Sequence, residues 1–160
     1  MDAESALSDA APGHKDELRL WLRLLTCANL IEAQIRRRLR LEFDTTLPRF
    51  DLLAALERDG AGLTLGEVSR RMMVSNGNVT GLATRLEAEG LIERRLDADD
   101  RRSIRLRLTA KGAREFARQS AAHESWIAEM LEGLAPGDRA QLYRLLGHAK
   151  TSIRDRLDTE

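Results

Sequence analysis

The chain has 160 residues, in which 26 Lys plus Arg are balanced by 26 Asp plus Glu, so its net charge is zero. This length suits one small domain with or without an added dimerisation element, and a neutral chain does not attract nucleic acid through bulk charge. Any DNA affinity must therefore depend on where individual arginines lie. No segment approaches the roughly 20 apolar residues of a membrane span, and the N-terminus lacks a signal-peptide pattern, so we expect a cytoplasmic protein.

The first 47 residues predict a tail followed by one long helix. Residues 1–13 are small and acidic, which is typical of a disordered tail. From His14 to about Phe43, apolar residues cover more than one narrow stripe of a helix, and such a broad surface needs more than one partner. We expect residues 14–47 to form a helix for dimerisation and ligand binding. A bundle within one chain is the alternative.

Four arginines lie close together on this helix, at Arg36, Arg37, Arg38 and Arg40. A solvated helix face is the commoner explanation of such a run. The sharper hypothesis is a phosphate-bearing effector, because guanidinium groups suit phosphate better than lysine does.

Pro48 predicts the first turn of a second helix, which Asp59 and Gly60 end, with Phe50 near its start. Between Thr64 and Leu86 the sequence predicts two short helices and a tight turn. Thr64 and Glu67 have the spacing of a capping box, and Ser75 can cap the second helix. Two helix starts this close predict a helix-turn-helix.

The outer face of the second short helix is unusually small and uncharged. An interior glycine costs about 1 kcal/mol relative to alanine, so Gly77 and Gly81 need a reason. Close approach to DNA supplies one, because Asn and Thr can contact base edges in the major groove. A core helix pair with a polar outer face is the alternative. The residues predicted to contact DNA here are Thr64, Ser75, Asn76, Gly77, Asn78, Thr80, Gly81, Thr84 and Arg85.

A β-hairpin is predicted next, after Gly90, which suits a left-handed helix C-cap. The predicted strands are Leu91–Arg95 and Ser103–Thr109, and the second alternates strictly, with Ile104 on the same side as two leucines. Arginines at the hairpin tip could reach phosphates or a narrow minor groove, oriented by neighbouring aspartates. A solvated hairpin with a protected edge strand is the alternative. The predicted contact residues at the tip are Asp100, Arg101 and Arg102.

Two further helices are predicted at the C-terminal end. Thr109 caps one that runs to about Glu132, and Pro136 begins another that runs to about Leu157. We expect residues 48–109 to bind DNA and residues 110–160 to form dimerisation helices. The last helix is predicted to turn inward its apolar residues Leu142, Leu145, Leu146, Ala149 and Ile153.

This order of elements resembles the MarR family of winged-helix transcription regulators. The wing motif of that family has an Asp-Arg-Arg core, alternating apolar residues, then Leu-Thr and a Gly. The matching residues are Asp100, Arg101, Arg102, Ile104, Leu106, Leu108, Thr109 and Gly112. The resemblance implies a mainly α (α+β) fold: a winged helix-turn-helix with a dimerisation region formed by the N- and C-terminal helices. It also implies a homodimer that binds a pseudopalindromic operator, usually as a repressor, and releases it when a small effector binds.

The chain is similar to a MarR subgroup that senses hydroxycinnamoyl-coenzyme A thioesters and represses aromatic-acid catabolism, in the stretch LRLWLRLLTCANLIEAQIRRRLRLEFDTTLPRFDLLAALERDG and in the later segment MMVSNGNVTGL. That resemblance implies a site with aromatic residues around the ring and arginines at the phosphates. A free phenolic effector, or oxidation of Cys27, is the alternative, although a buried inert thiol is the simpler expectation for Cys27. The implied effector-binding residues are Trp21, Asn29, Arg36, Arg37, Arg38, Arg40, Phe43 and Phe50.

The sequence contains no motif that indicates an enzyme. The three histidines are far apart, Cys27 has no partner cysteine, and no glycine-rich phosphate loop or nucleophile elbow is present. We therefore expect no catalytic site, cofactor or metal. His123 could touch an effector or a metal, but an interface histidine is the simpler interpretation. A helical protein–protein adaptor with a winged-helix fold is the remaining alternative, and it leaves the Asn, Thr and Gly face unexplained.

Overall fold

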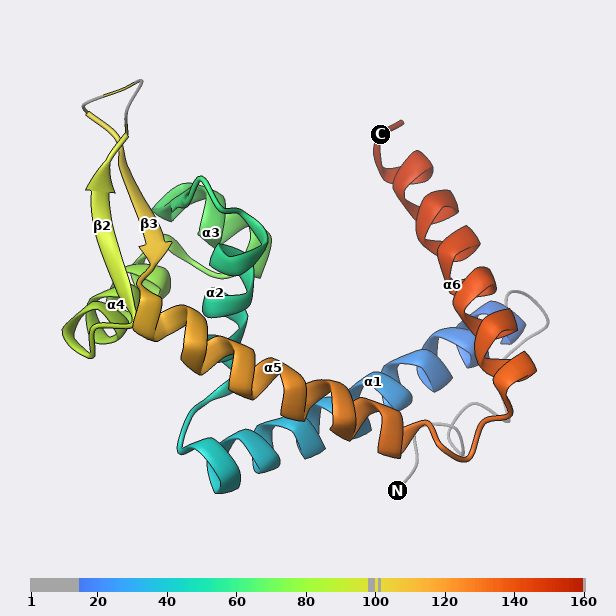
Figure 1. The fold of residues 1–160 in the computed structure, drawn as a ribbon. Coiled ribbons are helices and arrows are strands. Elements are labelled where there is room, and N and C mark those ends of the chain that lie inside the picture. Colours follow the sequence, from blue (N-terminus) through green and yellow to red (C-terminus); the bar gives the residue numbers. More distant parts are fainter. Residues whose placement is uncertain (1–14, 98–99, 101, 160) are drawn as a thin grey trace. The chain divides into compact units, whose positions relative to one another are not determined.

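The computed structural model describes residues 15–97, 100 and 102–159 and shows a mainly α fold with a small antiparallel sheet (Figure 1). The mainly α fold class predicted from the sequence is confirmed. The predicted tail at residues 1–13 lies outside the described residues. The elements are α1 (Lys15–Phe43), α2 (Leu47–Arg58), β1 (Leu63–Thr64), α3 (Leu65–Met72), α4 (Asn76–Ala88), β2 (Ile92–Leu96), β3 (Ile104–Leu108), α5 (Ala110–Met130) and α6 (Pro136–Leu157).

The chain divides into two compact units, Met1–Glu124 and Ser125–Glu160, which are described separately below. In the first unit, α2, α3 and α4 share one hydrophobic core with the three strands, so the helix-turn-helix and the wing are supported by the same buried side chains. The fully buried members include Leu52, Val68, Val79, Leu86 and Leu106. Burying each such side chain is worth roughly 1.5–3 kcal/mol, which makes this core the main source of the domain's rigidity.

The sheet has the order β1-β3-β2, and both pairings are antiparallel. Strand β1 was not predicted, because two residues are too few to show an alternating pattern. Ile104 was predicted to lie on the same half-buried side as Leu106, but 47% of Ile104 is exposed while Leu106 is fully buried. The reason is that the β2–β3 hairpin extends beyond the core, as Figure 1 shows.

The helix starts follow from local side-chain chemistry. The capping box of α3 is present, since Thr64 Oγ1 accepts from the Glu67 N–H at 3.2 Å and Glu67 Oε2 accepts from the Thr64 N–H at 2.8 Å. Ser75 caps α4, and Thr109 Oγ1 accepts from the Gly112 N–H at 3.0 Å at the start of α5. Gly112 is required there, because a Cβ would lie 1.8 Å from the Leu91 carbonyl oxygen.

The long helices α1 and α6 leave much of their apolar surface exposed. In α1 only Ile35 and Leu39 are buried, whereas 55% of Trp21 is exposed. The prediction that the apolar residues of α6 point inward is wrong for this chain, because α6 has no buried residue and 48% of Leu145 is exposed. Within the described ranges, none of the helices combines the length and hydrophobicity needed to cross a bilayer.

Candidate nucleic-acid interface

The outer face of α4 is open to solvent along its whole length. Every residue of α4 predicted to contact DNA is exposed, from Asn76 to Arg85, as is the capping Ser75. Thr80 Oγ1 donates to the Asn76 carbonyl at 2.8 Å, and Thr84 Oγ1 donates to the Thr80 carbonyl at 2.9 Å. With their hydroxyls turned to the helix backbone, both threonines have their methyl groups available for an apolar contact such as the thymine methyl.

The two glycines of α4 are not needed by the chain's own packing. A Cβ built at Gly77 or Gly81 would meet nothing within 4 Å. Gly81, in the interior of α4, therefore lowers helix propensity without an intramolecular reason, and Gly77 in the first turn likewise has no packing role within the chain. A surface that approaches α4 from outside would supply the reason, which is what the sequence predicted.

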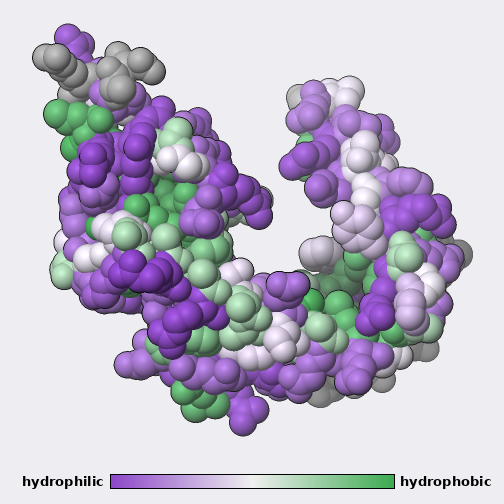
Figure 2. Space-filling view, viewed as in Figure 1, coloured by the Kyte–Doolittle hydropathy of each residue, from purple (hydrophilic) through white to green (hydrophobic). Residues whose placement is uncertain are grey.

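Arg102 is exposed in the loop of the wing, while Arg101 lies outside the described residues. Asp100 Oδ1 accepts from the backbone N–H of Arg102 at 2.9 Å. This hydrogen bond orders the backbone of the turn that carries Arg102. In Figure 2 hydrophilic residues dominate the surface over the wing strands, with a hydrophobic group of atoms next to the grey tip.

Thr64 occupies a different place from the other predicted contacts. It is half-buried, its hydroxyl accepts from Glu67 in the α3 cap, and its backbone pairs with Arg105 across the sheet. Its side chain is therefore already engaged in holding the start of α3.

Two arginine links that the sequence did not reveal connect the wing to the helix-turn-helix. Arg94 of β2 donates to Thr84 Oγ1 at 3.1 Å and lies 3.5 Å from a carboxylate oxygen of Glu87, so it ties the wing to α4. Arg105 of β3 contacts Asp97 and Glu67. Arg105 alternates with apolar residues in β3, which indicated only a solvent-facing side of the strand, and Arg94 lies in the polar run of β2, which indicated no particular partner.

The predicted effector residues do not form one site. Arg36 pairs with Glu32 at 2.5 Å on the same helix, and helical spacing places Arg37 on another side of α1. Phe43 lies under the Arg118 guanidinium at 5.6 Å, whereas Phe50 is 7% exposed and packs on Phe116, with ring centroids 5.5 Å apart. Arg38 is partly buried, and exposed positions are occupied by Trp21, Asn29 and Arg40.

A cavity of about 360 Å³ lies in the first unit where the end of α1 meets α2, α4 and α5. Among the predicted effector residues, Phe43 alone contributes to its wall. The lining residues are Phe43, Asp44, Thr45, Arg49, Leu53, Glu89, Leu91, Lys111, Glu115 and Gln119.

An ion pair lies in the wall of this cavity. Both Arg49 guanidinium nitrogens NH1 and NH2 donate to the Glu89 carboxylate, and Lys111 Nζ donates to the Glu89 carbonyl at 2.7 Å. The hydrogen bond from Arg49 lowers the pKa of Glu89 below its ordinary value and is also the main reason that the pKa of Arg49 is raised. Gln119 is 2% exposed, and its Oε1 accepts no hydrogen bond from the residues that the structure describes.

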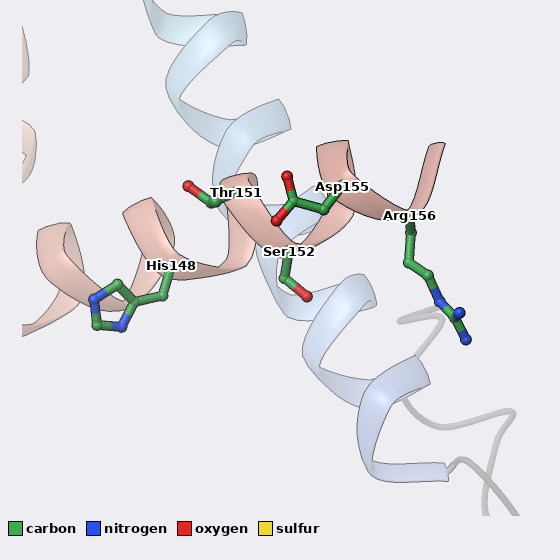
Figure 3. Close-up of a pocket in the computed structure, with 5 residues that line it drawn as sticks. All are labelled: His148, Thr151, Ser152, Asp155 and Arg156. Atoms are coloured by element: carbon green, nitrogen blue, oxygen red, sulfur yellow. The ribbon is translucent and has the colours of Figure 1, made fainter. Parts of the chain in front are cut away.

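A second depression is lined by five residues of α6 alone (Figure 3). His148, Ser152 and Arg156 are spaced four residues apart and so lie along one side of the helix. Among the described residues, a single helix supplies the whole lining, so this depression carries no argument for a ligand site.

Two predicted alternatives concern His123 and Cys27. His123 packs on Phe50, with ring centroids 5.0 Å apart, and burial lowers the pKa of its imidazole. This contact makes it a packing residue within the first unit. Cys27 is exposed, so the expectation of a buried thiol is wrong for the single chain, because the apolar face of α1 is left uncovered.

Comparison with known proteins agrees with this architecture. A family model described as the MarR family matches residues 43–103. The crystal structure of a MarR family transcriptional regulator from Silicibacter pomeroyi is similar, with 30% sequence identity, a TM-score of 0.75, and coverage of 90% of this chain and 99% of that one.

Two curated relatives carry names that describe regulation in opposite directions. The transcriptional activatory protein BadR of Rhodopseudomonas palustris is 35% identical over 116 residues, which are 70% of this chain and 66% of BadR. The HTH-type transcriptional repressor MdtR of Bacillus subtilis is 36% identical over 90 residues, which are 56% of this chain and 57% of MdtR. The chain belongs to the MarR family of winged-helix transcriptional regulators, which bind DNA and are not enzymes.

Proposed function

We propose that the protein binds a pseudopalindromic operator as a homodimer and represses transcription until a small effector releases it. The outer face of α4 would enter the major groove, and the wing would reach the neighbouring minor groove. The observation that carries this proposal is the exposed, small and polar surface of α4, in which Gly77 and Gly81 have open space around them. A face of this kind suits close approach to base edges.

Substitutions in α4 and the wing test the proposal on an operator recovered from bound genomic fragments. Arg102→Ala should weaken binding uniformly across operator variants and reduce the slope of log affinity against log salt by about 1. Asn78→Ala or Thr80→Ala should mainly relax the sequence preference. Uniform losses for all three variants would contradict base reading by α4.

Salt dependence separates this function from that of a protein–protein adaptor. Phosphate neutralisation predicts a steep fall in affinity between 50 and 200 mM salt, of the order of a thousandfold for about six phosphate contacts. An adaptor would not bind genomic DNA at either salt concentration. Fusing the operator to a reporter gene would then distinguish repression from activation.

For the effector, we propose a hydroxycinnamoyl-coenzyme A thioester that acts on genes of aromatic-acid catabolism. The cavity beside Phe43 has the volume of a small ligand site, and Phe43 in its wall would pack against an aromatic ring. The exposed Arg37 and Arg40 of α1 do not line the cavity and would meet phosphates that extend out of it. Calorimetric titration should show that the thioester binds far better than the free acid and lowers operator affinity. Equal binding of both compounds would favour a free phenolic effector, and binding of neither would reject the aromatic class.

Oxidation of Cys27 is a second candidate signal, because its thiol is exposed. A peroxide series in the operator-binding assay tests it, with Cys27→Ser as the control. If oxidised wild-type protein keeps full affinity, Cys27 has no sensing role.

A further inference from the structure

Arg105 occupies the middle of the sheet at the base of the wing. It lies in β3, the central strand, opposite Thr64 of β1 and Arg95 of β2. The like charge of Arg95 is compensated within its own strand, because Arg95 Nε donates to Glu93 at 2.6 Å. Arg105 can therefore bind acceptors other than Glu93.

The Arg105 guanidinium donates hydrogen bonds to three acceptors from three parts of the chain. Its Nε donates to Asp97 Oδ2 at 2.5 Å, and its NH1 donates to the Gly62 carbonyl at 3.0 Å and to Glu67 Oε2 at 3.3 Å. Asp97 follows directly after β2 and begins the wing loop, whereas Gly62 leads into β1. The wing loop and the strand next to α3 are thus joined through one planar cation.

The contact with Glu67 extends this link to the helix-turn-helix. The same Oε2 atom of Glu67 accepts from the Thr64 N–H at 2.8 Å in the capping box that begins α3. A guanidinium has five N–H donors in a fixed geometry, so it constrains the directions of its acceptors as well as their distances. Rotation of the wing about its base would break the contact with Asp97 or the contact with Glu67.

Arg107 provides a natural comparison two residues further along β3. Its Nε donates to the Ala61 carbonyl at 2.9 Å, so it contacts the same loop before β1. Among the residues that the structure describes, it forms no ion pair with Asp97 or Glu67. Arg107 therefore shares the strand and the charge of Arg105, but it does not link the wing to α3.

We propose that Arg105 is a positioning residue that holds the wing at a fixed angle to the helix-turn-helix, so that Arg102 and α4 reach one DNA duplex together. This inference rests on the proposed DNA binding through α4 and the wing. Arg105 itself is 29% exposed at its side chain and is occupied by its acceptors, so it acts through Arg102 and does not need to touch DNA.

The test compares Arg105→Ala with Arg107→Ala, Arg105→Lys and Arg102→Ala on the same operator. Hydroxyl-radical footprinting follows the minor groove at the wing, and methylation protection follows the major groove at α4. Arg105→Ala should lose the wing footprint and about tenfold in affinity, as Arg102→Ala does, while keeping the α4 footprint at saturation. Arg107→Ala should keep both footprints, and Arg105→Lys should recover only part of the loss.

Coupling between the two arginines is the decisive result. If Arg105 acts through Arg102, the double variant Arg102→Ala/Arg105→Ala should bind no more weakly than Arg102→Ala alone. Multiplied losses, an unchanged footprint in Arg105→Ala, or full recovery with lysine would each overturn the proposal. Should Arg105→Ala unfold, Asp97→Asn removes the wing arm of the link and must reproduce the same pattern.

Failure of the proposed function would look different. If Arg102→Ala and the α4 variants leave operator binding unchanged, DNA recognition by these elements is wrong. If those variants behave as expected but Arg105→Ala matches wild type, only the positioning role is wrong.

Discussion

Gly81 illustrates how a single residue can favour contact over stability. It lies in the interior of α4 with open space where a Cβ would be, so nothing in the chain's own packing selects glycine. Alanine at such a position would strengthen the helix by about 1 kcal/mol, because glycine loses more backbone freedom on folding. Glycine at this position therefore lowers the stability of the helix, and any benefit must come from a contact with another molecule.

We expect Gly81→Ala to raise the free energy of unfolding by about 1 kcal/mol and to weaken operator binding, because the added methyl group meets the DNA. Denaturant unfolding and an operator titration measure the two effects. Gly147→Ala is the matched control, since Gly147 is also inside a helix with nothing near its Cβ. The control should gain stability without losing DNA affinity. A Gly81→Ala variant that binds the operator normally would contradict close approach at this position.

At the scale of the helices, side chains at the junction of α2, α4 and α5 fix the C-terminal end of α4. Glu89 directly follows α4. Arg49 of α2 donates to its carboxylate, and Lys111 of α5 donates to its backbone carbonyl. Thr45 supports Arg49 by accepting from its Nε at 3.2 Å. The C-terminal end of α4 is thus fixed to the helices that surround the cavity, which gives a ligand in that cavity a physical route to α4.

We expect Glu89→Gln to lower the free energy of unfolding at pH 7 by roughly 0.5–1 kcal/mol, because the pair is partly exposed to solvent. The Arg49 hydrogen bond lowers the pKa of Glu89 in the folded state below its ordinary value of 4.5. The carboxylate therefore contributes its full stability above pH 4.5 and loses it as the pH falls through the lower, folded-state pKa.

Thermal unfolding of wild type and Glu89→Gln from pH 7 down to pH 3 measures this difference. It should be largest at neutral pH and shrink below the ordinary glutamate pKa. Glu87→Gln serves as the control, since its contact with Arg94 is longer, at 3.5 Å. A difference between wild type and Glu89→Gln that stays constant with pH would show that the charge of Glu89 is not responsible.

At the scale of the whole molecule, exposed apolar helix faces indicate association. On α6 the exposed residues Leu142, Leu145, Leu146 and Ile153 recur at helical spacing, and on α1 Trp21 belongs to a similar exposed series. Monomeric proteins seldom expose contiguous apolar patches of this kind. A second copy of the chain would cover them and would provide the two α4 helices that a palindromic operator requires.

We expect Leu145→Glu to raise the dimer dissociation constant at least tenfold, because a carboxylate would be buried in an apolar interface, an effect of roughly 1.4 kcal/mol or more. Sedimentation across a concentration series measures it. Operator affinity should fall with dimer content, since each monomer reaches one half-site. Thr151→Glu places the same charge on the opposite side of α6 and should leave the dimer intact. Equal dissociation constants for Leu145→Glu and wild type would place the dimer interface elsewhere.

Much of the fold could be predicted because its signals are local. The capping box at Thr64, the cap at Ser75 and the proline at Pro136 act within one helical turn, so the sequence identifies these helix starts directly. The exposed polar face of α4 follows from the same periodicity. For this reason the helix-turn-helix, the wing and their predicted contact face could all be placed from the sequence.

The remaining features depend on residues that are far apart in the chain. Strand β1 exists only because Leu63 and Thr64 pair with β3, and Arg105 meets Glu67 38 positions away. The arginine run of α1 looked like one cluster in sequence, but helical geometry spreads it around the helix, and Arg36 pairs with Glu32. The sequence by itself determined the helices, the β2–β3 hairpin, their order and the exposed polar face of α4, because caps and periodicity are local. The tertiary structure alone decided which charges meet, where the cavity lies and which apolar faces stay uncovered, because these depend on how distant segments pack.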